Sequence, residues 1–181
     1  MNRIQRLAII TRLMDCLDEK GSWCGETHIQ KAAYFLQELL RVPIGCQFVL
    51  YKYGPFSFDL RDELTAMRAD GVVQLCLQPP PYGPSLRTTE LAKRIQGQCP
   101  KTLDKYGEKI AFAADRLGNK GVSELERLAT ALYVTREAEH GASVDDRAAR
   151  IRQVKPHVPI DQARESVEWL DKIAEEADQA V

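Results

Sequence analysis

The sequence has no surplus of charge of either sign and no long apolar run. Its 181 residues carry 25 Lys and Arg against 26 Asp and Glu, a formal net charge of −1. A chain without a positive surplus lacks the general attraction to nucleic acids and anionic membranes that basic proteins have. No run approaches the roughly 18 apolar residues of a membrane-spanning helix, and Arg12, Asp15 and Asp18 interrupt the apolar core that an export signal would need. We therefore expect a protein that is neither exported nor membrane-spanning.

The cysteines lack the spacing of a metal site or of a redox motif. They are odd in number, form no CxxC pair and stand mostly among apolar neighbours, at Cys16, Cys24, Cys46, Cys76 and Cys99. Free thiols of this kind are typical of a reducing compartment. The pattern predicts a cytoplasmic protein without disulfides.

Residues that would support catalysis are also scarce. The three histidines, His28, His140 and His157, are far apart and stand in no HExxH, HxE or nucleophile-elbow context. Cys24 and His28 are half a zinc site at most, because no second pair supplies the other ligands. Residues 118–123 (GNKGVS) lack the spacing of a phosphate-binding loop and are interpreted as a helix stop and cap. We predict no enzymatic activity, no cofactor and no bound metal.

What the sequence does have is helical hydrophobic spacing. Apolar residues three or four apart predict helices over residues 3–18, 27–42, 57–70, 89–96, 103–117, 123–132, 143–154 and 160–177. The spacings of Thr27 with Gln30 and of Ser123 with Glu126 are those of capping boxes. Ser57 is a suitable N-cap for its helix.

Two regions favour extended structure. Residues 46–53 are rich in aromatic and β-branched residues and predict one strand that runs into a turn at Gly54 and Pro55, with a positive φ at the glycine. Residues 72–77 and 86–88 flank a proline-rich segment, which predicts a hairpin that resembles the wing of a winged helix.

These elements together define the expected fold class. We predict an α+β protein that is mostly α-helical. A winged-helix-like unit with a small β-wing spans residues 1–99, and a helical extension over 100–181 packs on it within one globular domain.

Several of these segments resemble a known family. Residues 27–36 (THIQKAAYFL) and 48–57 (FVLYKYGPFS), followed by Leu60, Leu64 and GVV at 71–73, are similar to the YwgA-like family. The Lys-Pro pair at 155–156, leading into IDQA at 160–163, is similar to the C-terminal pattern of that family. The signature also resembles the toxin-binding C-terminal domain of DNA ADP-ribosyl glycohydrolase antitoxins and, more distantly, the Panacea (SocA-like) antitoxin domain.

The resemblance implies an interaction module with a protein partner of the toxin type. The motif residues carry no assigned chemistry in those relatives, and this chain has no macrodomain-like region ahead of the motif, so the resemblance implies the binding role alone. We therefore expect a non-enzymatic antitoxin-type or phage-defence module that neutralises or regulates its partner by occlusion. The candidate partner-binding residues around the motif are Lys31, Tyr34, Lys52, Tyr53, Phe56 and Arg61.

Two alternatives stay open on the sequence alone. The aromatic residues suit core packing as well as an interface, and the cations suit a solvated face. The predicted helix–helix–wing order also permits a winged-helix DNA-binding regulator. Residues 57–70 carry two arginines against four acids, however, and residues 78–87 carry one cation. Because such a face repels phosphate, nucleic acid is the less favoured partner.

Overall fold

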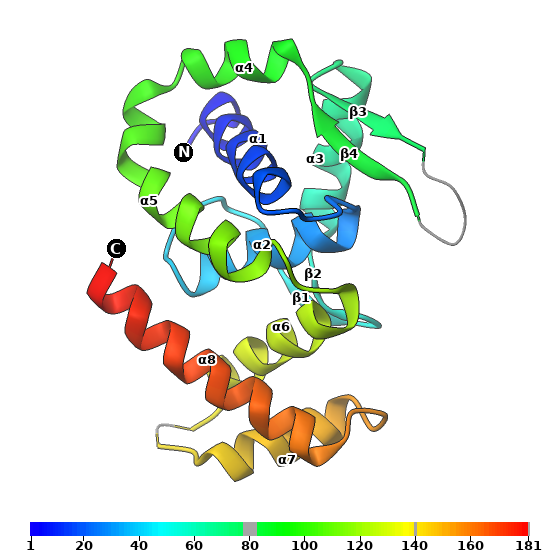
Figure 1. Ribbon diagram of the computed structural model, residues 1–181, viewed down its shortest axis with the longest axis vertical. Coiled ribbons are helices and arrows are strands. Elements are labelled where there is room, and N and C mark those ends of the chain that lie inside the picture. Colours follow the sequence, from blue (N-terminus) through cyan, green and yellow to red (C-terminus); the bar gives the residue numbers. More distant parts are fainter. Residues whose placement is uncertain (78–82, 140, 181) are drawn as a thin grey trace.

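The structure, a computed structural model, describes residues 1–77, 83–139 and 141–180. Within them the chain forms eight helices and two antiparallel hairpins, which confirms the mostly α-helical α+β class (Figure 1). The elements are α1 (Arg3–Glu19), α2 (Glu26–Glu38), β1 (Val49–Tyr51), β2 (Gly54–Phe56), α3 (Phe58–Ala69), β3 (Val73–Cys76), β4 (Ser85–Thr88), α4 (Glu90–Gly97), α5 (Pro100–Leu117), α6 (Val122–Glu137), α7 (Val144–Val154) and α8 (Ile160–Ala180).

Helix α1 lies at the centre of the N-terminal half, where α4 and α5 curve around it (Figure 1). It begins with a capping box in which the Asn2 side chain accepts from the backbone of Gln5 at 2.9 Å and Gln5 Oε1 accepts from the backbone of Asn2 at 3.1 Å. Its buried side chains are not limited to one stripe, because α2, α4, α5 and β4 all contact it. The Thr11 hydroxyl in this core is satisfied by the Leu7 carbonyl at 2.8 Å.

The predicted capping box of the second helix is wrong, since α2 begins after an N-cap at Gly25. Gln30 serves a longer-range contact instead: its side-chain amide donates to the Ser57 carbonyl at 2.9 Å and accepts from the Ser57 backbone at 3.0 Å. The Ser57 hydroxyl in turn accepts from the backbone of Leu60 at 3.2 Å and caps α3, as predicted. The start of α3 is thereby fixed on α2.

A β-hairpin takes the place of the single strand predicted over residues 46–53. Val49, Leu50 and Tyr51 pair with Phe56, Pro55 and Gly54, and Lys52 and Tyr53 form the turn. The turn therefore precedes Gly54, which lies in β2 with φ +86°. The positive φ predicted for this glycine is confirmed, although its place in a turn is not.

The second hairpin, β3–β4, follows α3 in the order predicted for a wing. Val73 pairs with Thr88 and Cys76 with Ser85, while most of the proline-rich segment between these strands lies outside the described residues. Thr89 then caps α4 through the backbone of Leu91 at 3.2 Å.

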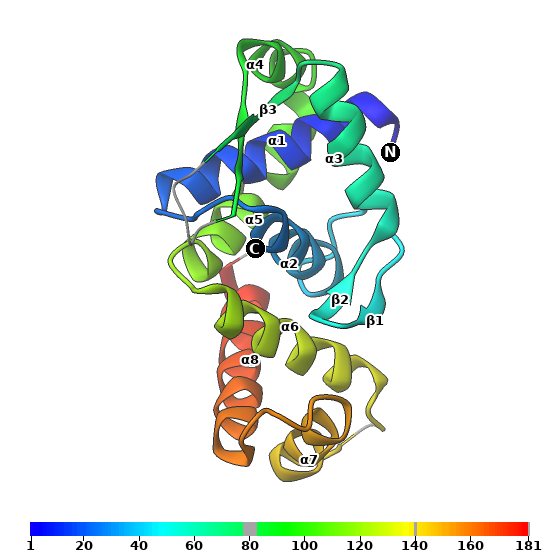
Figure 2. The ribbon, with the colours of Figure 1, turned by 90° about the vertical axis from the view of Figure 1, so that its right-hand side faces the viewer.

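The C-terminal half is built from α6, α7 and α8, which contact one another. Helix α6 joins this half to the rest because it also contacts α2 and β2, as Figure 2 shows. Its N-cap is Gly121, so the predicted capping box of Ser123 with Glu126 is wrong. Helix α5 packs on α1 and α2, within the N-terminal half. The division of the chain at residues 99 and 100 stays a prediction.

Candidate functional site

The β1–β2 hairpin and the first residue of α3 expose a group of aromatic rings. The ring centroids of Tyr51 and Phe56 are 6.0 Å apart, those of Tyr51 and Phe58 5.7 Å, and those of Phe56 and Phe58 5.2 Å. Tyr51 is 56% exposed and Phe58 42% exposed, with Val49 and Tyr53 also exposed beside them. We refer to Val49, Tyr51, Tyr53, Phe56 and Phe58 as the aromatic patch.

Two of the predicted partner-binding cations flank this patch. The Lys52 ammonium lies 5.2 Å from the centroid of the Tyr53 ring, and the Arg61 guanidinium lies 5.1 Å from that of Phe58. Both residues are exposed. Arg61 also pairs with Asp62 at 2.8 Å, whereas Lys52 has no ion pair within the part of the chain that the structure describes. Lys52 and Tyr53 thus lie together in the hairpin turn, and Arg61 lies on Phe58, whose ring packs against Phe56.

Lys31 does not belong to that surface. Its side chain is 1% exposed, and its ammonium donates to the Pro55 carbonyl at 2.8 Å. Burial lowers the pKa of Lys31 to about 8, although the nearby Glu126 carboxylate acts against this shift. The expectation that Lys31 presents its charge to a partner is wrong, because this lysine holds the back of the hairpin against α2.

Tyr34 is buried as well. It is 1% exposed, with its ring centroid 5.0 Å from that of Phe48 and 6.4 Å from that of Phe35. Burial raises the pKa of Tyr34 above its usual range. For this residue the core-packing alternative is confirmed, and a direct contact with a partner is excluded in this conformation.

The hairpin rests on α6 at a close approach. A Cβ atom built on Gly54 would lie 3.0 Å from the Thr130 hydroxyl and 3.3 Å from the Glu126 carbonyl. The Lys155 ammonium, from the segment between α7 and α8, donates to the Lys52 carbonyl at the hairpin turn. Three of the segments that carry the family resemblance therefore meet here, at residues 27–36, 48–57 and 155–163.

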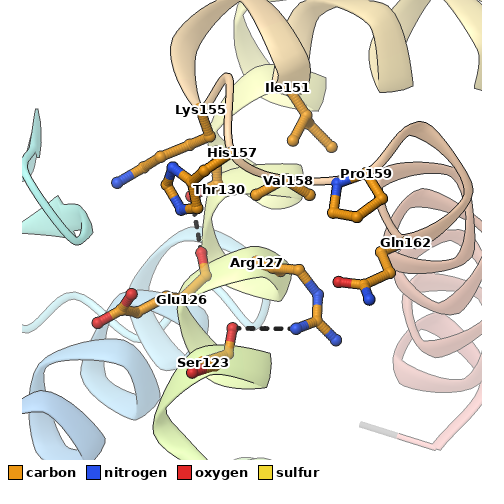
Figure 3. A pocket seen from close by; sticks show the side chains of 10 residues that line it. All are labelled: Ser123, Glu126, Arg127, Thr130, Ile151, Lys155, His157, Val158, Pro159 and Gln162. Atoms are coloured by element: carbon orange, nitrogen blue, oxygen red, sulfur yellow. Dashed lines mark hydrogen bonds between the residues drawn. The ribbon is translucent and has the colours of Figure 1, made fainter.

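A pocket of about 210 Å³ opens next to this junction, between α6 and the α7–α8 segment. Figure 3 shows Glu126 and Lys155 on its wall, and the Lys31 ammonium is also near enough to attract the Glu126 carboxylate. Burial raises the pKa of Glu126 and lowers that of Lys155. The pocket is lined by Ser123, Glu126, Arg127, Thr130, Ile151, Lys155, His157, Val158, Pro159 and Gln162.

The sequence alone does not assign a site to these residues. Its spacing indicates a capping role for Glu126, and Lys155 stands in a segment between two predicted helices. The one signal that links them to the hairpin is the resemblance, which includes Lys155 but gives no contact for it.

The acidic face predicted for α3 is largely neutralised in the structure. Glu63 accepts from Arg3 at 2.9 Å and from Arg6 at 3.1 Å, and Asp70 accepts from Arg3 at 3.1 Å. A charge count along α3 alone misses these arginines because they lie in the first turns of α1. Repulsion of phosphate by α3 is accordingly weaker than the sequence indicates. The ion pairs neutralise acidic side chains but do not make this face of α3 basic.

The candidates for catalysis and metal binding are dispersed or buried. Burial lowers the pKa of the His28 imidazole and raises that of the Cys24 thiol, so both favour their neutral forms. Across the described ranges no three His, Cys, Asp or Glu residues are arranged to hold a metal ion. His140 lies outside the described residues.

Comparisons of the chain with protein-family models, with curated proteins and with solved structures gave no match. Among the described residues, no helix combines the length and the apolar character that crossing a bilayer requires.

Proposed function

We propose that this chain is a non-enzymatic protein-binding module that docks its partner on the aromatic patch. The observation that carries the proposal is a group of three mutually packed rings, the exposed Tyr51 and Phe58 and the half-buried Phe56, on the hairpin and the start of α3, which are fixed from behind. Exposed apolar clusters of this kind mark interaction surfaces, and Tyr, Phe and Arg are enriched where protein interfaces are buried.

The rigidity of the hairpin supports this assignment. Lys31 donates to a backbone carbonyl of β2, and Lys155 donates to a backbone carbonyl of the hairpin turn. Gln30 fixes the start of α3. The patch is therefore ordered before a partner arrives. Association then costs less conformational entropy than it would for a mobile loop.

The chemistry of the patch indicates the chemistry of its partner. The rings form an apolar centre, and Lys52 and Arg61 supply positive charge at the rim. The complementary surface has an apolar centre with acidic side chains around it. The family resemblance suggests that this partner is a toxin, which the module would neutralise by covering its working surface.

A titration with the protein encoded by the neighbouring gene tests the proposal. We expect a one-to-one complex that Tyr51→Ser combined with Phe58→Ser weakens at least about tenfold, because buried aromatic anchors dominate such interfaces. The matched control is Leu91→Ser, which changes an apolar residue that is 39% exposed on α4. It should leave the affinity unchanged.

The same preparation distinguishes the DNA-binding alternative. With duplex DNA from upstream of the gene we expect only nonspecific affinity, with Kd about 10⁻⁴ to 10⁻⁶ M at physiological salt. Nanomolar sequence-selective binding to this DNA, or a protein complex that tolerates the double substitution, would refute the proposed function.

A further inference from the structure

The pocket beside the hairpin has more positive than negative groups on its wall. Arg127 and Lys155 line it together with His157, and Glu126 is the one acid among its lining residues. Figure 3 shows the Glu126 carboxylate directed away from Arg127, on the side of α2 and the hairpin. The nearby ammonium groups of Lys31 and Lys155 attract this carboxylate. The part of the pocket around Arg127 is thus left without a counter-charge.

Arg127 has an incomplete set of hydrogen bonds. Its Nε is buried and has no acceptor, and its Nη1 donates to the Ser123 carbonyl over a long 3.5 Å. Guanidinium groups carry five N–H donors, and buried donors are normally paired. No salt bridge involves Arg127 within the described residues. An arginine in this state at a pocket wall is suited to receive an acceptor from outside the chain.

The other groups near Arg127 favour the same class of ligand. Gln162, in the first turn of α8, directs its side-chain amide oxygen toward Arg127 across the pocket (Figure 3). The guanidinium alone can bind both oxygens of a carboxylate, and the Gln162 amide can donate to the same group once it turns its NH2 toward the pocket. The volume of about 210 Å³ is below the roughly 300 Å³ at which pockets for drug-sized ligands begin. It therefore suits a single side chain or a small acid.

We propose that this pocket binds a carboxylate group, with Arg127 as its principal contact and Gln162 and His157 beside it. A monoanion fits better than a phosphate dianion because Glu126 stands on the same wall and repels each added negative charge. The carboxylate has two possible sources, an acidic side chain of the partner protein or a free small acid. The inference goes beyond the proposed function, since it concerns α6 and the α7–α8 segment and does not need the aromatic patch.

Titration of the isolated protein, followed by the NMR signal of the Arg127 Nε–H, tests the proposal. One probe is N-acetylglutamate N-methylamide, which mimics a glutamate side chain within a chain, and the other is free butyrate, which is also a monoanion. We expect saturable shifts at millimolar concentrations and none with the uncharged N-acetylglutamine N-methylamide. Tighter binding of the capped glutamate assigns the site to a partner side chain, and tighter binding of butyrate assigns it to a free acid.

Two variants and a control complete the test. Arg127→Gln, followed through other signals of the pocket, should weaken carboxylate binding about tenfold, while Arg94→Gln, an exposed arginine of α4, should not change it. His157→Ala, an exposed position, gives a second reading if Arg127→Gln lowers the melting temperature. The proposal is overturned if neither carboxylate gives saturable shifts, if the glutamine analogue or inorganic phosphate binds as well, or if all variants respond alike. None of these results depends on finding the protein partner.

Discussion

Replacement of Gly54 by alanine tests whether the hairpin is held against α6 as the structure indicates. Two separate features of this position oppose a side chain. The backbone has φ +86°, and a Cβ atom would meet the Thr130 hydroxyl at 3.0 Å and the Glu126 carbonyl at 3.3 Å. The hydroxyl can shift, but the carbonyl belongs to the backbone of α6.

The size of the effect follows from these two features. A left-handed conformation costs an alanine about 1–2 kcal/mol, and the close approach to α6 adds an overpacking cost of about 1–2 kcal/mol. Gly45 provides the matched control because it has φ +80° and no atom within 4 Å of the position that a Cβ atom would take. Gly45→Ala should therefore show the conformational cost alone.

Thermal and urea unfolding of the two variants measure the difference. In a chain of this length about 1 kcal/mol shifts the melting temperature by roughly 2–4 °C. We expect a decrease of about 9 °C for Gly54→Ala and about half that for Gly45→Ala. Equal decreases for the two variants would refute the close packing of β2 on α6.

Four further substitutions test other features of the structure. Lys31→Met removes an ammonium group whose pKa is lowered by burial to about 8. Above that pH the unfolded chain binds more protons than the folded one, so the stability of the wild type should rise with pH. Urea unfolding should show a rise of about 1–3 kcal/mol relative to the variant between pH 7 and pH 10. A pH-independent difference would contradict the burial of this charge. Gly107→Ala should stabilise the protein by about 0.5–1 kcal/mol, because this position in α5 has open space around it, and a loss of stability would contradict the helix. Lys52→Glu and Arg61→Glu should each change the free energy of unfolding by no more than about 0.5 kcal/mol. In stopped-flow measurements both should slow association with an acidic partner and reduce the salt dependence of the association rate. Unchanged association kinetics for both variants would contradict an interface at the aromatic patch.

The helices could be predicted because their signals are local. Ile110, Ala113 and Leu117 follow the periodicity of one buried face, and they are buried in α5. The Ser57 cap and the positive φ of Gly54 were likewise predictable from residue type and immediate neighbours. Gln30 behaved differently, because its side chain binds Ser57, and local spacing cannot distinguish that use from a capping box.

The candidate site was predictable only in part, since its key contacts join distant segments. Lys52 and Arg61 are exposed, as the sequence predicts. The burial of Lys31 depends on a carbonyl of β2, at Pro55, and on Glu126 of α6. The net charge of the surface around α3 depends on arginines of α1 that pair with its acidic side chains. Charge and aromatic content along one segment do not contain this information.

Hydrogen exchange measured with and without the protein partner most directly tests the assignment of the interface to the aromatic patch. Binding should slow exchange of the backbone amides of residues 49–58 relative to the free protein, with no change in α4. Protection confined to α7 and α8, or the same protection at every element, would contradict the proposed interface.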